Sequence, residues 1–348
     1  MTIPPNRFLQ RRQFMTMSSM AGMGALLPNF SFAADQKTNF LKANPPKIFL
    51  VTWRGMTDVE RGFMAYWKSQ GINPIYIHRD GALKIDNLIA IKKEIMDTQP
   101  DLVHTWGTQT TTTMVGHFDK PDPIIGNRIP LVFTAVTDPI ASNIVKTLTN
   151  HGRNLAGLSH TAPLLTQLIA INSYQPIKTL GVIYDKTALN SKIFVGLLQN
   201  VAKEQNFKLA LAPYPLHPNG TVNASEEINA QLVDQIARDG ANWLYFGPDT
   251  LIFTQHVSLS KLATAKKILT FAAVETLISP ASQTLMGLVS DFDQLGMLAA
   301  FKGRELLSGR TNIAVEYLEH YQLLVKVATA KALGVFPPLS LLNKAQLQ

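Results

Sequence analysis

LVHTWGTQTTTTM, from Leu102 to Met114, joins a run typical of a buried strand to a segment rich in threonine, with Gly107 between them. Threonine is a poor helix former that favours positions where its hydroxyl can satisfy a free backbone group. A glycine lets the backbone approach a ligand closely, and hydroxyls in a first helical turn can cap free amides or contact a ligand. The stretch therefore predicts a strand, a tight turn and a helix that begins near Thr108.

The same alternation of strand and helix recurs along the chain in two series. Apolar runs predict strands at 47–53, 72–78, 101–106 and 129–135, and again at 178–184, 207–212, 242–247 and 268–273. Periodic apolar residues predict helices between them, including one that begins at the capping box of Thr57 and Glu60. Such alternation produces parallel sheets covered by helices on both faces. The sequence thus predicts an α/β fold with two doubly wound, Rossmann-like lobes.

Polar and acidic side chains follow several of the predicted strands. Ligands of open α/β sheets bind outside the carboxyl ends of the strands, so these loops are the candidate binding site. The candidate ligand-binding residues from these loops are Trp53, Gly107, Thr108, Thr137, Asp138, Asn190, Ser191, Asp249 and Glu275.

Each candidate also has a structural interpretation. Thr108 could only cap its helix, although free amides at a helix start suit a carboxylate. Trp53 either stacks on a planar ligand or closes the top of a core. Asp138, which precedes Pro139, and Asp249 both fit a helix N-cap as well as they fit a ligand. For an amino-acid ligand, Asp249 or Glu275 would accept the ammonium group.

The N-terminus has the form of a twin-arginine signal peptide. Arg11 and Arg12 precede an apolar segment, and Ser31-Phe32-Ala33 has small residues at both specificity positions, so residues 1–33 are predicted to be cleaved off. The alternative is an uncleaved anchor, but the apolar region at 15–27 is shorter than the ~20 residues of a membrane span. Residues 34–46 are expected to be a linker, and the mature chain is expected in the periplasm.

Composition narrows the class of protein further. The net charge is +8, but no basic block or arginine-rich helix indicates nucleic-acid binding. The chain has no cysteine, and its eight histidines lack a metal-ligand spacing. Walker A, G-x-G-x-x-G and G-x-S-x-G motifs are also missing from the sequence, so neither a cofactor nor a metal is expected. An enzyme is the less favoured alternative that the sequence leaves open, because paired acids such as Asp138 and Asp249 could face each other across a cleft.

Five segments in order resemble one family. They are PDLVHTWGTQTTT, IPLVFTAVTDPI, HGRNLAGLSH, PIKTLGVIYDKTALNS and LLVKVATAKALGVFPPLSLL. They are similar to the substrate-binding proteins of ABC transporters of the tryptophan/tyrosine-binding type. The resemblance runs from about Lys47 to the C-terminus, and the segment 116–128 is longer than is usual there.

This resemblance implies a type I periplasmic binding protein with two lobes and a hinge of three crossovers, near Ala156, Ser290 and Gln322. Lobe 1 would comprise 47–155 and 291–321, and lobe 2 would comprise 156–290 and 322–348. The family's positions facing the cleft fall on Thr108, Asp138, Asn190, Ser191 and Asp249, and its first loop on Asp58.

The implied function is the solute-binding component of an ABC importer. The protein would be a monomer and not an enzyme, and would bind an aromatic amino acid or similar compound for delivery to a membrane permease. A sensory binding protein that presents its ligand to a membrane receptor or kinase is the alternative. Transcriptional regulators share this architecture but carry a DNA-binding segment, whereas here only a signal and a linker precede Lys47.

Overall fold

The computed structural model describes residues 39–318, 320–343 and 345–348, so the predicted signal peptide lies outside the described residues. A six-stranded parallel sheet forms the first lobe, in the order β13-β7-β6-β3-β1-β2. Its strands are β1 (Lys47–Thr52), β2 (Ile75–Asp80), β3 (Leu102–Trp106), β6 (Leu131–Thr134), β7 (Leu155–Ser159) and β13 (Val315–Tyr317).

Alternating side chains of this sheet enter two cores. Ile48 and Leu50 of β1 face one core, which includes residues of α2 (Asp58–Ser69) and α9 (Phe292–Leu307). Phe49 and Val51 face the other core, which includes residues of α3 (Ile85–Thr98) and α4 (Thr108–Val115). Because successive residues of a strand point to opposite faces, a strand buried on both faces is apolar throughout. This is why the sequence reveals β1 and β3 so clearly.

The helices α2 and α9 pack unusually close together. A Cβ atom at Gly62 would lie 2.1 Å from the carbonyl oxygen of Asp293, and one at Gly296 would lie 1.9 Å from that of Val59. Only glycine fits at such an approach. The predicted capping box at the start of α2 is confirmed, because Thr57 and Glu60 each bond the other's backbone or side chain there.

A seven-stranded sheet forms the second lobe, in the order β15-β14-β12-β11-β10-β8-β9. Its strands are β8 (Thr179–Tyr184), β9 (Lys208–Pro213), β10 (Trp243–Phe246), β11 (Leu269–Ala272), β12 (Met286–Val289), β14 (Gln322–Val325) and β15 (Ala345–Leu347). All neighbouring strands are parallel except β12 and β14. The two-lobe α/β fold predicted from the sequence is therefore confirmed.

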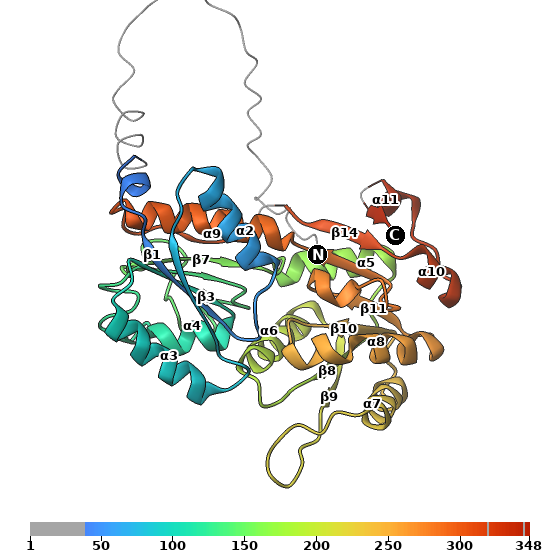
Figure 1. The fold of residues 1–348 in the computed structure, drawn as a ribbon. Helices are drawn as coiled ribbons and strands as arrows, with labels where there is room; N and C mark the ends of the chain where they lie inside the picture. Colours follow the sequence, from blue (N-terminus) through green and yellow to red (C-terminus); the bar gives the residue numbers. More distant parts are fainter. Residues whose placement is uncertain (1–38, 319, 344) are drawn as a thin grey trace, which may run out of the picture.

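Helices cover both faces of this sheet as well. One core contains residues of α5 (Leu164–Tyr174), α6 (Leu189–Gln205), α10 (Val327–Leu333) and α11 (Leu339–Leu342). The opposite core contains residues of α7 (Glu226–Arg238), α8 (Thr250–Ala265) and the 3-10 helix η1 (Glu275–Ile278). In Figure 1 the two lobes lie side by side, with the first lobe on the left.

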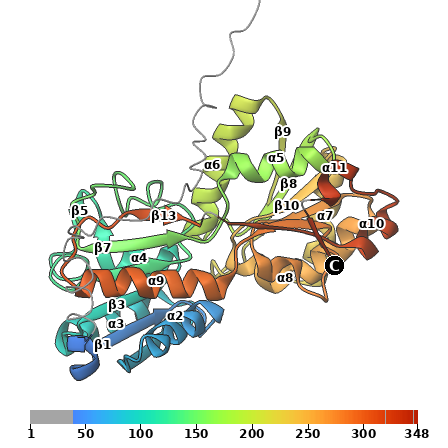
Figure 2. The same cartoon turned by 90° about the horizontal axis from the view of Figure 1, so that it is seen from above.

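The chain passes between the sheets three times, after β7, after β12 and between β13 and β14. Figure 2 shows these connections where the lobes meet. The last two lie close to Ser290 and Gln322, where they were expected. The first lies after Ser159, because β7 pairs with β6 along residues 155–157 and with β13 as far as Ser159. The division of the chain into domains by residue number stays a prediction.

Two segments differ from the simple alternation. Residues 39–43, in the expected linker, form a short helix whose Leu41 is buried. The long segment 116–128 contains the strand pair β4 (Gly116–His117) and β5 (Lys120–Pro121). It is fixed by an ion pair of 2.7 Å between Lys92 and Asp122 and by Arg153, which donates to the carbonyl oxygen of Gly116 at 3.5 Å.

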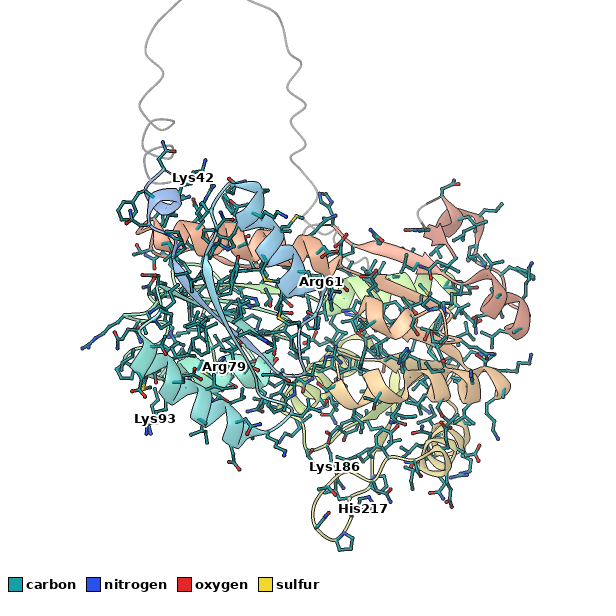
Figure 3. The ribbon with its side chains drawn as sticks, viewed as in Figure 1. Lys42, Arg61, Arg79, Lys93, Lys186 and His217 are labelled. Atoms are coloured by element: carbon teal, nitrogen blue, oxygen red, sulfur yellow. The ribbon has the colours of Figure 1, made fainter. Side chains whose placement is uncertain are left out.

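Labelled basic side chains in Figure 3 lie apart from one another over both lobes, on elements that include α2, β2 and α3. Within the described residues, none of the helices has the length and apolar character needed to cross a bilayer.

Candidate functional site

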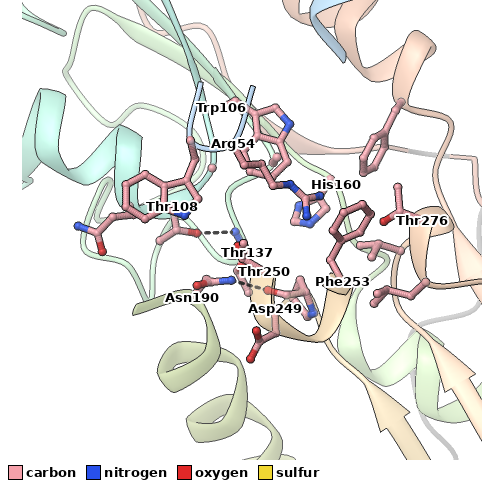
Figure 4. A pocket seen from close by; sticks show the side chains of 18 residues that line it. Arg54, Trp106, Thr108, Thr137, His160, Asn190, Asp249, Thr250, Phe253 and Thr276 are labelled. Atoms are coloured by element: carbon pink, nitrogen blue, oxygen red, sulfur yellow. Dashed lines mark hydrogen bonds between the residues drawn. The ribbon is translucent and has the colours of Figure 1, made fainter. Parts of the chain in front are cut away.

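A cavity of about 50 Å³ lies between the lobes, and loops from both sheets line it. From the first lobe come the segments after β1, β3 and β6, and from the second come those after β10 and β11. The carboxyl ends of the parallel strands thus meet here, as the sequence predicts. Figure 4 shows the lining side chains, which include five aromatic rings: Trp53, Trp106, His160, Phe253 and Phe292.

Arg54 is one of the lining residues, and its guanidinium group lies near rings of both lobes. Its guanidinium carbon lies 5.1 Å from the ring centroid of Trp106, in the first lobe, and 4.0 Å from that of Phe253, in the second. Its Nη1 atom is buried and has no hydrogen-bond partner among the described residues. Burial lowers the pKa of Arg54 to about 10, against the effect of Glu60, so the side chain remains a cation at neutral pH. A stacked cation with an unused donor is suited to an anionic ligand group.

The turn after β3 has the predicted form. Gly107 has a φ of +92° and precedes α4, which begins at Thr108. The hydroxyl of Thr108 accepts a hydrogen bond of 3.1 Å from the backbone N–H of Thr137, so it ties two loops of the first lobe together (Figure 4). Thr111 and Thr113 bond back to carbonyl groups four residues earlier. Most of these threonine hydroxyls are therefore used within the protein, while Gly107, Thr108 and Thr137 line the cavity.

Asp249 lines the cavity from the second lobe and caps α8. Its Oδ1 accepts from the N–H groups of Leu251 (2.7 Å) and Ile252 (3.2 Å). Its Oδ2 accepts from the N–H of Asp185 (2.8 Å) and the hydroxyl of Ser191 (2.5 Å). Burial raises the pKa of Asp249, while the hydrogen bonds lower it. The cap interpretation of this residue is thus confirmed.

Asn190 and Ser191, at the start of α6, have different positions. Asn190 lines the cavity and donates to the carbonyl oxygen of Pro248 at 2.5 Å (Figure 4). Ser191 is 1% exposed and contacts Asp249 without lining the cavity. Its role is to position the carboxylate of Asp249.

Three further side chains of the lining carry polar atoms without a partner. Trp106 Nε1, His160 Nδ1 and Thr276 Oγ1 are buried without a hydrogen-bond partner in the described part of the chain. Burial lowers the pKa of His160 to about 4, and the charge of Arg54 lowers it as well, so the ring is neutral at neutral pH. An unpaired buried polar atom is costly, so these groups indicate that a ligand completes the site.

The remaining predicted site residues lie elsewhere. Asp58, paired with Arg61, and Glu275 line a larger adjoining cavity of about 940 Å³, which shares Thr276 and Phe292 with the first. Asp138 lines a third cavity, and its Oδ1 accepts from the N–H groups of Ile140 and Ala141. The structure thus brings together six of the ten candidates: Trp53, Gly107, Thr108, Thr137, Asn190 and Asp249.

The sequence interpretation missed Arg54, Trp106, His160, Phe253, Thr276 and Phe292. Arg54 follows Trp53 at the end of a predicted strand, and Thr276 follows the predicted Glu275, so position could have identified both. His160 is one of the eight histidines for which the sequence shows no metal-ligand spacing, and it lines the cavity. Phe253 lies inside a helix and Phe292 after the second crossover, where no sequence signal indicates a ligand.

The larger cavity has a different character. Lys326 is 8% exposed there, and its Nζ donates to both the carbonyl oxygen and the hydroxyl of Ser282 and to the carbonyl oxygen of Ser279. All three N–H groups of this ammonium are therefore used. Among the described residues, no group of three His, Cys, Asp or Glu side chains could hold a metal ion.

Comparison with known proteins agrees with this architecture. A tyrosine-binding protein of Clostridioides difficile is 30% identical over 210 residues, which are 60% of this chain and 57% of the relative. The match thus spans a little over half of that relative's length. A conserved domain protein from Vibrio cholerae has a TM-score of 0.72 at 21% identity, covering 87% of this chain and 99% of that one.

The ABC domain from Streptococcus pneumoniae, solved in complex with L-Trp, has a TM-score of 0.70 at 19% identity, covering 86% of this chain and 99% of that one. At such identities the two solved structures support the fold alone. Residues 50–347 match the family described as ABC transporter substrate binding protein, and the chain belongs to that family.

Proposed function

We propose that this protein is the solute-binding component of an ABC importer, which captures a small aromatic ligand between its lobes and delivers it to a membrane permease. An aromatic amino acid or a similar compound is the proposed ligand class. The proposal includes export by the twin-arginine signal, a periplasmic location and a monomeric state. Binding proteins of this architecture present a closed shape that a partner can distinguish from the open one.

The observation that carries the proposal is the cavity between the lobes. Its ring-bearing walls suit a planar group, and Arg54 offers a cationic donor to a carboxylate. The names of the similar proteins, one that binds tyrosine and one in complex with L-Trp, support the aromatic ligand class.

The size of the cavity adds a requirement. About 50 Å³ is far below the ~300 Å³ of a small ligand site, so the lobes must separate before a ligand enters. The three crossovers between the sheets are the places at which the chain could bend. The proposed cycle is therefore opening, ligand entry and closure.

Thermal melting with a panel of amino acids, aromatic carboxylates, sugars and purines tests the proposal, because a ligand of the folded state raises the midpoint. We expect a shift with aromatic compounds that carry a carboxylate. Asn190→Ala should reduce this shift, whereas Asn200→Ala, an exposed position on the same helix α6, should not. A shift with sugars or purines alone would contradict the proposed ligand class.

A further inference from the structure

The charges that line the cavity between the lobes are few. Arg54 and Asp249 are the only Arg, Lys, Asp or Glu residues in its wall among those described. A zwitterionic amino acid needs a counter-charge for its carboxylate and another for its ammonium group. Arg54 would have to bind the carboxylate, and Asp249 would have to bind the ammonium group.

Asp249 is not free. A carboxylate has about four lone-pair sites for hydrogen bonds. The four bonds already described, from Leu251, Ile252, Asp185 and Ser191, use that number. All four donors belong to the second lobe and hold α8 and α6 to the sheet. An ammonium group would therefore have to displace one of these internal bonds.

Other carboxylates are poorly placed for an ammonium. Glu60 interacts electrostatically with Arg54 but does not line the cavity; its Oε2 accepts from Thr57, and its Oε1 is buried without a hydrogen-bond partner in the described residues. Glu275 and Asp58 line the adjoining cavity instead. In an α-amino acid the ammonium is attached to the carbon next to the carboxylate. If Arg54 holds the carboxylate, the ammonium must lie close to the same cation, which repels it.

The unused hydrogen-bond donors of the cavity favour an anion over an ammonium group. Nη1 of Arg54 and Nε1 of Trp106 are buried donors without partners in the described residues, and neither atom can accept a hydrogen bond. His160 Nδ1 and Thr276 Oγ1, which are also unpaired there, can accept a hydrogen bond, but both groups are uncharged and do not offset the charge of Arg54. The two side chains are in contact, with the guanidinium carbon 5.1 Å from the indole centroid. This stacked pair therefore carries two N–H groups that no described residue uses.

We infer that the cleft is specific for aromatic carboxylates that lack an ammonium group, such as arylalkyl carboxylic acids, with the carboxylate held by Arg54 and Trp106. The inference rests on the proposed function, because it specifies the ligand of the same cleft. Trp53, Phe253 and Phe292 supply the apolar surface for the ring.

Calorimetric titration with three matched compounds tests whether the cleft prefers aromatic carboxylates that lack an ammonium group. L-Phenylalanine carries both groups, 3-phenylpropionate lacks the ammonium, and 2-phenylethylamine lacks the carboxylate. We expect 3-phenylpropionate to bind at least tenfold more tightly than L-phenylalanine, and the amine to show no binding. The indole pair, L-tryptophan and indole-3-propionate, should show the same order.

Two variants locate the carboxylate. Arg54→Gln should weaken binding of 3-phenylpropionate at least tenfold, whereas Arg61→Gln, an exposed position on α2, should leave it unchanged. Trp106→Phe keeps an aromatic ring but removes the N–H, and should weaken binding severalfold. Because this second substitution is conservative, it remains informative if Arg54→Gln does not fold.

The outcomes separate the two proposals. Tighter binding of L-phenylalanine than of 3-phenylpropionate would overturn the inference and leave the proposed amino-acid uptake intact. Failure of every aromatic compound, with binding of a sugar or purine, would overturn both. Unchanged affinity for 3-phenylpropionate in the Arg54 and Trp106 variants would also overturn the inference, since the carboxylate would then be held elsewhere.

Discussion

The guanidinium carbon of Arg54, in the loop after β1, lies 4.0 Å from the ring centroid of Phe253, in the first turn of α8. The two residues belong to different lobes, so this cation–π contact spans the cleft. It can exist only when the lobes are close together. The contact is therefore part of the free-energy difference between the closed and open shapes.

Phe253→Ala should weaken ligand binding because it removes this contact from the closed shape. A cation–π contact contributes about 0.5–2 kcal/mol, so the dissociation constant should rise roughly two- to thirtyfold. Phe301→Ala is the matched control, since Phe301 contacts Arg304 of α9 and Tyr66 of α2, both in the first lobe, and is 38% exposed, against 37% for Phe253. Equal affinities of the two variants, measured by calorimetry, would contradict a role for the contact in closure.

Asp249→Asn should destabilise the second lobe, because an amide donor would then face N–H or O–H donors. The free energy of unfolding should fall by roughly 1–3 kcal/mol, the cost of leaving buried groups unsatisfied. Asp291→Asn, at the cap of α9, should cost far less, because its Oδ1 accepts one backbone N–H, from Gln294, and asparagine caps equally well. Denaturant unfolding measures both changes, and equal losses would refute the account of Asp249.

Stability should fall in mild acid because of His104. Burial lowers the pKa of this histidine to about 3, far below its usual value of 6.5. At a pH between these two pKa values, the unfolded chain binds a proton at this histidine that the folded protein does not. The free energy of unfolding therefore decreases as the pH falls below 6.5. From pH 7 to pH 5 the contribution is about 2 kcal/mol.

Urea unfolding at pH 7 and pH 5 measures this loss. His104→Asn should reduce the difference between the two pH values, whatever it does to stability at pH 7. His217→Asn, in an exposed loop, should leave the difference unchanged. A pH dependence that survives His104→Asn in full would show that other groups cause it.

Gly296→Ala should strongly destabilise the first lobe, because the new methyl group would lie 1.9 Å from the carbonyl oxygen of Val59. Overpacking of this kind costs typically 1–3 kcal/mol or more. Gly196→Ala, in α6 with nothing within 4 Å of its Cβ position, should be neutral or stabilising by roughly 0.5–1 kcal/mol. Similar unfolding midpoints of the two variants would contradict the close packing of α2 and α9.

Export should depend on the paired arginines near the N-terminus. The double substitution Arg11→Lys and Arg12→Lys should retain the chain in the cytoplasm, because the twin-arginine export machinery recognises this pair of arginines. Arg7→Lys should leave export intact. Cell fractionation measures the distribution, and full export of the double variant would show that another route carries the protein.

The strands could be predicted from the sequence wherever both of their faces are buried, as in β1, β3, β8 and β10. The residue pattern did not predict α9 or β13 as elements, and only the family resemblance implied that 291–321 return to the first lobe after the chain has built most of the second. Their placement depends on contacts between residues far apart, such as Gly62 with Asp293. Local periodicity does not contain that information.

The location of the site could be predicted from the sequence, but the roles of its residues could not. The positions of Thr108 and Asp249 followed from strand ends, whereas the saturation of Asp249 depends on Asp185 and Ser191, which are 64 and 58 residues away. Likewise, Arg54 can be recognised as the cation that would bind the ligand's carboxylate only once its stacking on Trp106 and Phe253 and its unused Nη1 are known.

The most direct test is a crystal structure of the protein with the tightest-binding aromatic carboxylate of the panel. The account predicts that the carboxylate lies within hydrogen-bond distance of Arg54 Nη1 and Trp106 Nε1, with the ring between the aromatic walls of the cleft. A ligand in the larger cavity beside Asp58 and Glu275, with Arg54 still unpaired, would contradict it.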